Sequence, residues 1–171
     1  MTSRFYRLIS SFANLGPIIL LYYLSISELD LEFSNMFQIL SFNLQIIIIF
    51  YWMLKNPNVL GNGNIFLAGI FNDVVMSLPL GISAITYLVV SFVAGYIRNV
   101  TVNRSLFTEW FTFVIAIFFS NLLFYILLNH FSNLTITYTD LFYNSFFTFL
   151  FFPIFWLFFN WYKQIFFLKN D

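Results

Sequence analysis

The 171-residue sequence has few of the residues that a water-facing surface or a polar active site requires. Only 8% of its side chains are charged, whereas a soluble domain normally carries about a quarter. It has no cysteine and a single histidine, which excludes disulfides and thiolate catalysis and argues against zinc sites. Basic and acidic residues balance at seven each, and no basic cluster offers a nucleic-acid surface. We therefore expect no metal, no cofactor and no nucleic-acid partner.

Hydrophobic residues make up 61% of the chain and fall in long runs, so lipid is the expected solvent. The runs predict an all-α membrane protein with a single integral membrane domain over residues 1–171. Proline is expected to break helices at Pro57 and at Pro153, where the last helix should kink. The six predicted spans cover about 8–26, 36–54, 59–78, 82–97, 110–128 and 141–162.

The first apolar run also has features of a secretory signal peptide. Arg4 and Arg7 precede it, and the segment 25–27 would serve as a small-residue cleavage site. We expect the run to be retained as a membrane span, because several further spans follow it.

Basic residues predict how the spans are oriented. Short loops that carry Lys and Arg stay in the cytoplasm, and a cytoplasmic N-terminus places all seven basic residues on that side: Arg4, Arg7, Lys55, Arg98, Arg104, Lys163 and Lys169. The outer side then receives Glu28, Asp30, Glu32, His130 and Asp140. A six-helix bundle with both termini inside follows. Tyrosine and tryptophan at span ends, including Tyr51 and Trp52, should form the interfacial aromatic belts.

The third span contains the only acidic residue inside an otherwise apolar run, Asp73. It precedes the turn Pro79-Leu80-Gly81, which is tight enough to make spans three and four antiparallel neighbours. A carboxylate at a helix centre costs about 2.5–3.5 kcal/mol in lipid. Two interpretations remain open from the residues alone. Asp73 either caps or hydrogen-bonds an adjacent helix, together with Asn72, or it faces a cavity and binds a ligand, a proton or a partner group.

The remaining polar residues in the spans have structural interpretations. Glu109 suits the first turn of its helix, where a carboxylate meets the positive end of the helix dipole, and His130 is interpreted as an interfacial polar residue. Four amides should hydrogen-bond between helices: Asn43, Gln45, Asn121 and Asn160. Small residues should permit close helix approach: Gly69, Gly81, Ala84, Ala94 and Gly95. The sequence shows no catalytic triad, phosphate-binding loop or carboxylate pair, so we do not expect an enzyme.

Several short segments occur together in one order: Tyr51-Trp52-x-Leu54-x-x-Pro57, then Phe66-x-x-Gly69-x-x-x-Asp73, then Leu80-Gly81. With these segments the chain resembles the rod shape-determining protein MreD family. The last span, which contains Pro153 and ends in Trp161-Tyr162-Lys163, is similar to the last helix of that family. The likeness covers most of the chain. Together with Pro79, the matching positions form a partner-binding or structural core motif: Gly69, Asp73, Leu80 and Gly81.

The resemblance implies a multi-pass protein of the bacterial inner membrane. The implied fold is similar to that of the substrate-binding subunits of energy-coupling-factor vitamin transporters. The implied function is a non-enzymatic scaffold of the elongation complex, which regulates cell shape and lateral peptidoglycan synthesis. Its partners would be the bitopic protein MreC and, through it, the MreB filament and the wall-synthesis enzymes. The alternative is a solute-binding subunit of a vitamin-type transporter, which would need convergent polar groups such as Asp73, Asn72, His130 and Asn121.

Overall fold

Every element of the computed structural model is a helix within residues 15–27, 43–101, 105–131 and 138–166, the part of the chain that is described. The prediction of an all-helical protein is confirmed. The seven helices are Leu15–Ile26, α3 (Leu44–Lys55), α4 (Pro57–Leu60), α5 (Asn62–Val75), α6 (Ile82–Val100), α7 (Leu106–Phe131) and α8 (Tyr138–Phe166).

Three of these helices, α6, α7 and most of α8, are long and apolar enough to cross a membrane. They correspond to the last three predicted spans, although all three helices extend beyond the predicted ends. The Leu15–Ile26 helix and α3 are apolar but shorter. Apart from Lys55, which lies one residue beyond the predicted end, they fall within the first two predicted spans. Residues 8–14 and 36–42 of those spans lie outside the described residues.

The prediction of one continuous third span over residues 59–78 is wrong. Pro57 does separate two helices, since α3 ends at Lys55 and α4 begins at the proline. However, α4 ends after one turn at Gly61, whose φ of 67° is incompatible with a continuing right-handed helix. The following helix, α5, has 14 residues, which is too short to span the roughly 30 Å hydrocarbon core by itself.

The end of α5 is closed by a Schellman motif three residues before the predicted end of the span. Ser77 has a left-handed φ of 53°, and its amide donates to the carbonyl of Val74 at 3.3 Å. The next amide, that of Leu78, reaches back to the carbonyl of Asp73 at 2.9 Å. This pair of bonds satisfies the last carbonyls of the helix and turns the chain back toward α6.

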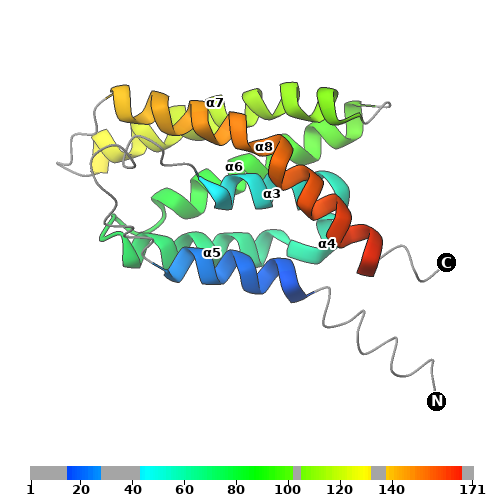
Figure 1. Ribbon diagram of the computed structural model, residues 1–171. Helices are drawn as coiled ribbons and strands as arrows, with labels where there is room; N and C mark the ends of the chain where they lie inside the picture. Colours follow the sequence, from blue (N-terminus) through cyan, green and yellow to red (C-terminus); the bar gives the residue numbers. More distant parts are fainter. Residues whose placement is uncertain (1–14, 28–42, 102–104, 132–137, 167–171) are drawn as a thin grey trace, which may run out of the picture.

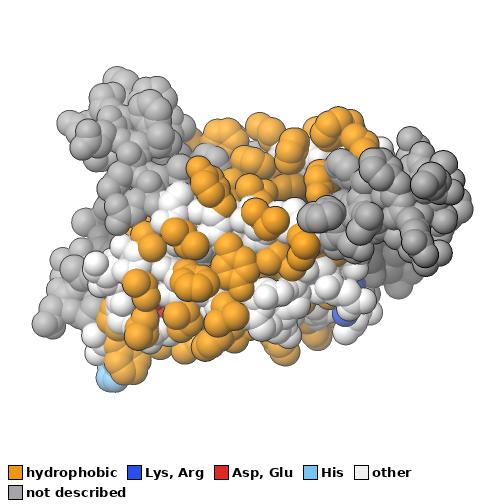
Figure 2. Space-filling view, turned by 90° about the horizontal axis from the view of Figure 1, so that it is seen from below, with side chains coloured by type: hydrophobic (Ala, Val, Ile, Leu, Met, Phe, Trp, Pro, Cys, Tyr) orange, Lys and Arg blue, Asp and Glu red, His pale blue; other side chains and the backbone are white. Residues whose placement is uncertain are grey.

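Successive helices run in alternating directions (Figure 1). α6 packs against α5, α7 and α3, and α7 also packs against α8. The predicted neighbours, spans three and four, are thus confirmed as the α5–α6 pair. Lys55, Arg98 and Lys163 lie in the last turns of α3, α6 and α8, and these three turns lie at the same end of the bundle (Figure 1), here named the basic end. Figure 2 shows Lys or Arg side chains and His at opposite ends of one face, with hydrophobic side chains between them.

α3 is the central helix of the core, with every residue from Ile46 to Leu54 buried. Phe50 contacts Phe113 of α7 at a ring-centroid distance of 4.9 Å and Phe152 of α8 at 5.8 Å. A helix that is hydrophobic all round belongs inside a bundle. The assignment of Tyr51 and Trp52 to an interfacial belt is therefore wrong, because both rings are buried.

The predicted kink at Pro153 is confirmed, because α8 continues through the proline and changes direction about half-way along its length (Figure 1). The proline bends the helix without ending it. Its first half follows α7, and its second half crosses toward α3 and the Leu15–Ile26 helix. A proline within a helix leaves the carbonyl four residues earlier without its donor, and in a membrane a neighbouring helix must supply one.

Candidate functional site

The carboxylate of Asp73 caps the N-terminus of the neighbouring helix α6. Its Oδ2 accepts the amide of Gly81 at 2.7 Å, and its Oδ1 accepts the amide of Ser83 at 2.8 Å. Asp73 is 0% exposed. The first amides of a helix have no partner within that helix, and they carry the positive end of its dipole. The amides and the dipole of α6 therefore stabilise the buried carboxylate.

The local sequence explains why this cap comes from another helix. Gly81 holds the N-cap position with a φ of 107°, which favours glycine, and glycine has no side chain with which to cap. Asn72, beside Asp73, donates to the hydroxyl of Ser83 at 3.0 Å. This geometry matches the first interpretation of Asp73, in which the residue caps an adjacent helix together with Asn72.

One turn before Asp73, α5 and α6 approach each other at Gly69. A Cβ atom on Gly69 would lie 2.6 Å from the nitrogen of Ala84, and still closer to the Cα of that residue. No side chain other than hydrogen fits between these two backbones. Gly69 and Ala84 thus behave as predicted for a close approach, whereas a Cβ on Gly81 or Gly95 would meet nothing within 4 Å.

The remaining motif residues form the turn itself. The carbonyl of Pro79 accepts the amide of Ile82 at 3.4 Å, and Leu80 stands at the tip with 69% of its surface exposed. Gly69 and Asp73 are buried. We name the segment from Gly69 to Ala84 the α5–α6 corner. Its buried residues determine how α5 and α6 pack against each other, and Leu80 has the most exposed side chain of the motif.

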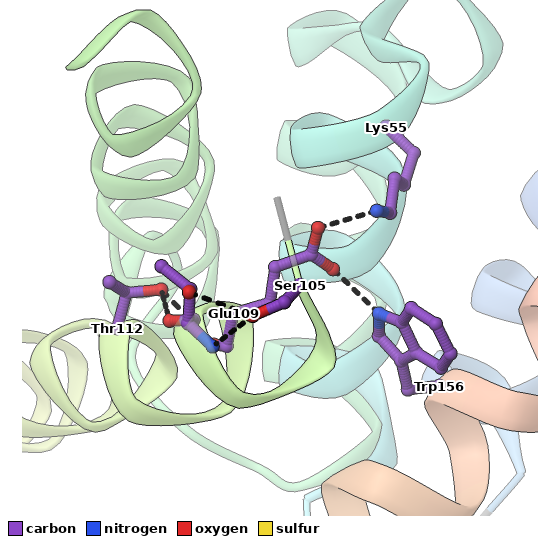
Figure 3. Close-up of polar contacts among 6 residues, drawn as sticks. Lys55, Ser105, Glu109, Thr112 and Trp156 are labelled. Atoms are coloured by element: carbon purple, nitrogen blue, oxygen red, sulfur yellow. Dashed lines mark hydrogen bonds and ion pairs between the residues drawn. The ribbon is translucent and has the colours of Figure 1, made fainter. Parts of the chain in front are cut away.

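A second polar cluster joins α3, α7 and α8 near the basic end (Figure 3). Lys55 of α3 forms an ion pair with Oε1 of Glu109 of α7, whose side chain is only 2% exposed. The indole nitrogen of Trp156 of α8 donates to the other carboxylate oxygen at 2.6 Å. The Lys55 ammonium also lies 5.5 Å from the centre of the Trp156 ring, within the range of a cation–π interaction.

Glu109 is positioned by the start of α7. The hydroxyl of Ser105 accepts the amide of Thr108 at 3.2 Å, and the carbonyl of Ser105 accepts the amide of Glu109 at 3.0 Å. Thr112 donates back to the carbonyls of Thr108 and Glu109. Ser105 thereby caps the helix and places the carboxylate one turn in, facing α3 and α8 (Figure 3).

The sequence does not predict this ion pair, because Lys55 falls in a predicted loop and Glu109 at the start of a separate predicted span. The predicted topology nevertheless contains an indication of this pair. The predicted orientation places the end of span two and the start of span five on the same side of the membrane, where opposite charges can meet.

The polar residues considered for a solute site do not form one group. Asp73 and Asn72 bond to α6, Asn121 of α7 donates to the hydroxyl of Ser145 of α8, and His130 is exposed at the end of α7. Two of the four span amides bond between helices as predicted, since Gln45 likewise donates to the carbonyl of Leu24 at 3.0 Å. Asn43 instead caps its own helix, α3.

Within the part of the chain that the structure describes, no group of three His, Cys, Asp or Glu side chains is placed to hold a metal ion. Comparison with models of known protein families, with curated proteins and with solved structures found no match to this chain.

Proposed function

We propose that this protein is a non-enzymatic scaffold subunit of the MreD type in the bacterial inner membrane. In this role it regulates cell shape and lateral peptidoglycan synthesis by holding an MreC-like bitopic protein, and through it the MreB filament and the wall-synthesis enzymes. Four of the positions that carry the resemblance, Gly69, Asp73, Leu80 and Gly81, lie in the α5–α6 corner.

The main support for the proposal is that the buried carboxylates of the bundle bond to other groups of the same chain. Both oxygens of Asp73 bond to the backbone of α6, and both oxygens of Glu109 bond to Lys55 and Trp156. These groups tie helices together, and their acceptor oxygens are occupied by the chain's own donors. A scaffold needs such a rigid interior.

The outer surface supports the same role. Large apolar side chains cover the outer faces of α7 and α8, which suits contact with lipid and with the helices of other membrane proteins. On these two helices the exposed ones include Phe107, Phe111, Phe118, Leu122, Phe142, Phe146, Leu150 and Ile154.

The proposal includes six crossings with both termini in the cytoplasm, the third made by the two helices α4 and α5 together. The alternating helix directions (Figure 1) and the position of Lys55, Arg98 and Lys163 at one end support this orientation, since basic residues favour the cytoplasmic side. The basic end then faces the cytoplasm and the α5–α6 corner faces outward. A reporter fused after Asp171 tests this, and an extracytoplasmic signal contradicts it.

The function is tested by affinity purification of the tagged full-length chain from native membranes, with co-purifying proteins identified by mass. We expect a bitopic membrane protein with an extracytoplasmic domain, and loss of rod shape when the chain is depleted. Tight binding of a vitamin by the purified chain, or co-purification with transporter ATPases instead, would overturn the proposal in favour of a transporter subunit.

A further inference from the structure

The bend of α8 is stabilised by a hydrogen bond from another helix. Pro153 has no amide hydrogen, so the carbonyl of Phe149, four residues earlier, lacks its usual donor. The indole nitrogen of Trp110 of α7 donates to this carbonyl at 2.8 Å. The Trp110 ring also stacks on the ring of Phe149, with a centroid distance of 5.0 Å and an interplanar angle of 18°. Trp110 thus replaces the missing amide.

A second hydrogen bond from an indole lies on the other side of the proline. Here the donor belongs to α8 and the acceptor to α7. Trp156 of α8, three residues after Pro153, donates to the carboxylate of Glu109, which is the neighbour of Trp110 in α7. Lys55 of α3 holds the other oxygen of that carboxylate. One turn of α7 therefore contacts α8 both before and after its bend.

The second half of α8, residues 154–166, lies over α3 as a result. Phe159 contacts the ring of Tyr51 at a centroid distance of 5.3 Å, and Tyr162 contacts Trp52 at 6.2 Å. The hydroxyl of Tyr162 occupies the space that a side chain at Gly16 would need. This half-helix covers the aromatic face of α3 and joins it to the Leu15–Ile26 helix.

Few buried side chains hold this half-helix in place. Among residues 154–165 only Phe159 is buried. Most of the other large apolar side chains point outward: Ile154, Leu157, Phe158, Trp161 and Ile165. Phe155, Trp156 and Tyr162 are half-buried against the core. The hydrogen bond of Trp156 to Glu109 is a polar contact that fixes the half-helix to α7.

We propose that residues 154–166 form an arm that moves about a hinge at Pro153. Trp110 supports the hinge by bonding the carbonyl that the proline leaves free. The Lys55–Glu109–Trp156 cluster is the latch that keeps the arm closed over Tyr51 and Trp52. Release of the latch swings the arm outward, while α7 and the first half of α8 keep their packing. This inference does not depend on the proposed scaffold function.

The arm is tested by spin-label distance measurements on the full-length chain in lipid nanodiscs. The chain contains no cysteine, so introduced cysteines are the only labelling sites. One pair joins the arm to α7 through Trp161→Cys and Phe107→Cys, at positions that are 58% and 67% exposed. The control pair joins the first half of α8 to α7 through Phe142→Cys and Phe118→Cys, which are also exposed.

We expect a single narrow arm–α7 distance when the latch is intact. Glu109→Gln and Trp156→Phe should each add a second, longer population to this distance while the control distance stays unchanged. An arm distance that stays narrow in both variants overturns the proposal. Parallel broadening of both distances overturns it as well, because the cluster would then stabilise the whole bundle rather than the arm.

A separate experiment tests the hinge. It uses the substitution Pro153→Ala, which restores a backbone amide hydrogen at residue 153. Trp110→Phe should broaden the arm distance in the Pro153 chain, because the carbonyl of Phe149 then has no donor. The same substitution should have no effect in the Pro153→Ala chain, where residue 153 itself supplies the amide. Equal effects in the two backgrounds overturn the assigned role of Trp110.

Discussion

Substitution of Gly69 by alanine tests the close approach of α5 and α6. The added Cβ would lie 2.6 Å from the nitrogen of Ala84 and 2.9 Å from the carbonyl carbon of Ser83. Non-bonded carbon atoms normally lie about 3.5–4.0 Å apart. Because the neighbours are backbone atoms, no side-chain rotation relieves the overlap. The two helices must separate by roughly 1 Å, which also pulls the Asp73 cap away from α6.

The expected destabilisation follows from two opposing terms. Overpacking costs about 1–3 kcal/mol, and the backbone overlap together with the strained cap place Gly69→Ala near the upper figure. Alanine is more favourable than glycine in a helix interior by about 1 kcal/mol, which offsets part of this cost. The net loss of unfolding free energy is about 2 kcal/mol, or roughly 30-fold in the unfolding equilibrium constant.

Gly63→Ala provides a matched control on the same helix. A Cβ at Gly63 meets nothing within 4 Å, so only the helix propensity acts. Because Gly63 lies in the first turn of α5 rather than in its interior, the variant should be more stable by about 0.5 kcal/mol. Both variants are measured by equilibrium unfolding of the full-length chain in mixed micelles with increasing denaturing detergent. If Gly69→Ala is as stable as Gly63→Ala, the close approach of the two helices is refuted.

Three further predictions use the same unfolding assay. Asp73→Ala should lose about 3 kcal/mol, since two charge-assisted hydrogen bonds disappear, whereas Asp73→Asn keeps one acceptor and should lose roughly half as much. Ser77→Gly should gain about 1 kcal/mol, because glycine has no steric penalty at the left-handed φ of 53°. Glu109→Gln should lose about 3 kcal/mol by leaving the Lys55 charge without its partner. Adding Lys55→Met to that variant should restore part of the loss.

Each of these predictions has a contradicting result. Equal stability of Asp73→Ala and the unchanged chain would show that the cap does not hold α6. A lower unfolding free energy for Ser77→Gly would mean that the serine side chain stabilises the fold by more than its left-handed backbone destabilises it. A double variant less stable than Glu109→Gln alone would show that Lys55 stabilises the bundle through contacts other than the ion pair.

Much of the helical content follows from the sequence, because it depends on local composition. The apolar runs that become α6, α7 and α8 are long enough to identify by composition alone. The turn at Pro79-Leu80-Gly81 is short, which makes its flanking helices neighbours without any knowledge of the rest of the fold. The capping role of Asp73 was one of two interpretations that the residues left open. The hydrogen bonds to the amides of Gly81 and Ser83 are what distinguish it.

Only the tertiary structure decides how the helices use their polar and aromatic residues. Tyr51 and Trp52 are interfacial by sequence, but α3 is surrounded by α6, α7 and α8, which buries both rings. Pro153 predicts a kink by local rules, but only the fold shows that Trp110 of α7 donates to the carbonyl that the proline leaves without its usual amide. The pairing of Lys55 with Glu109 joins residues 54 positions apart. The sequence by itself determined the long helices α6, α7 and α8, because their formation is local. The contacts between helices depend on which faces meet, and packing in three dimensions decides that.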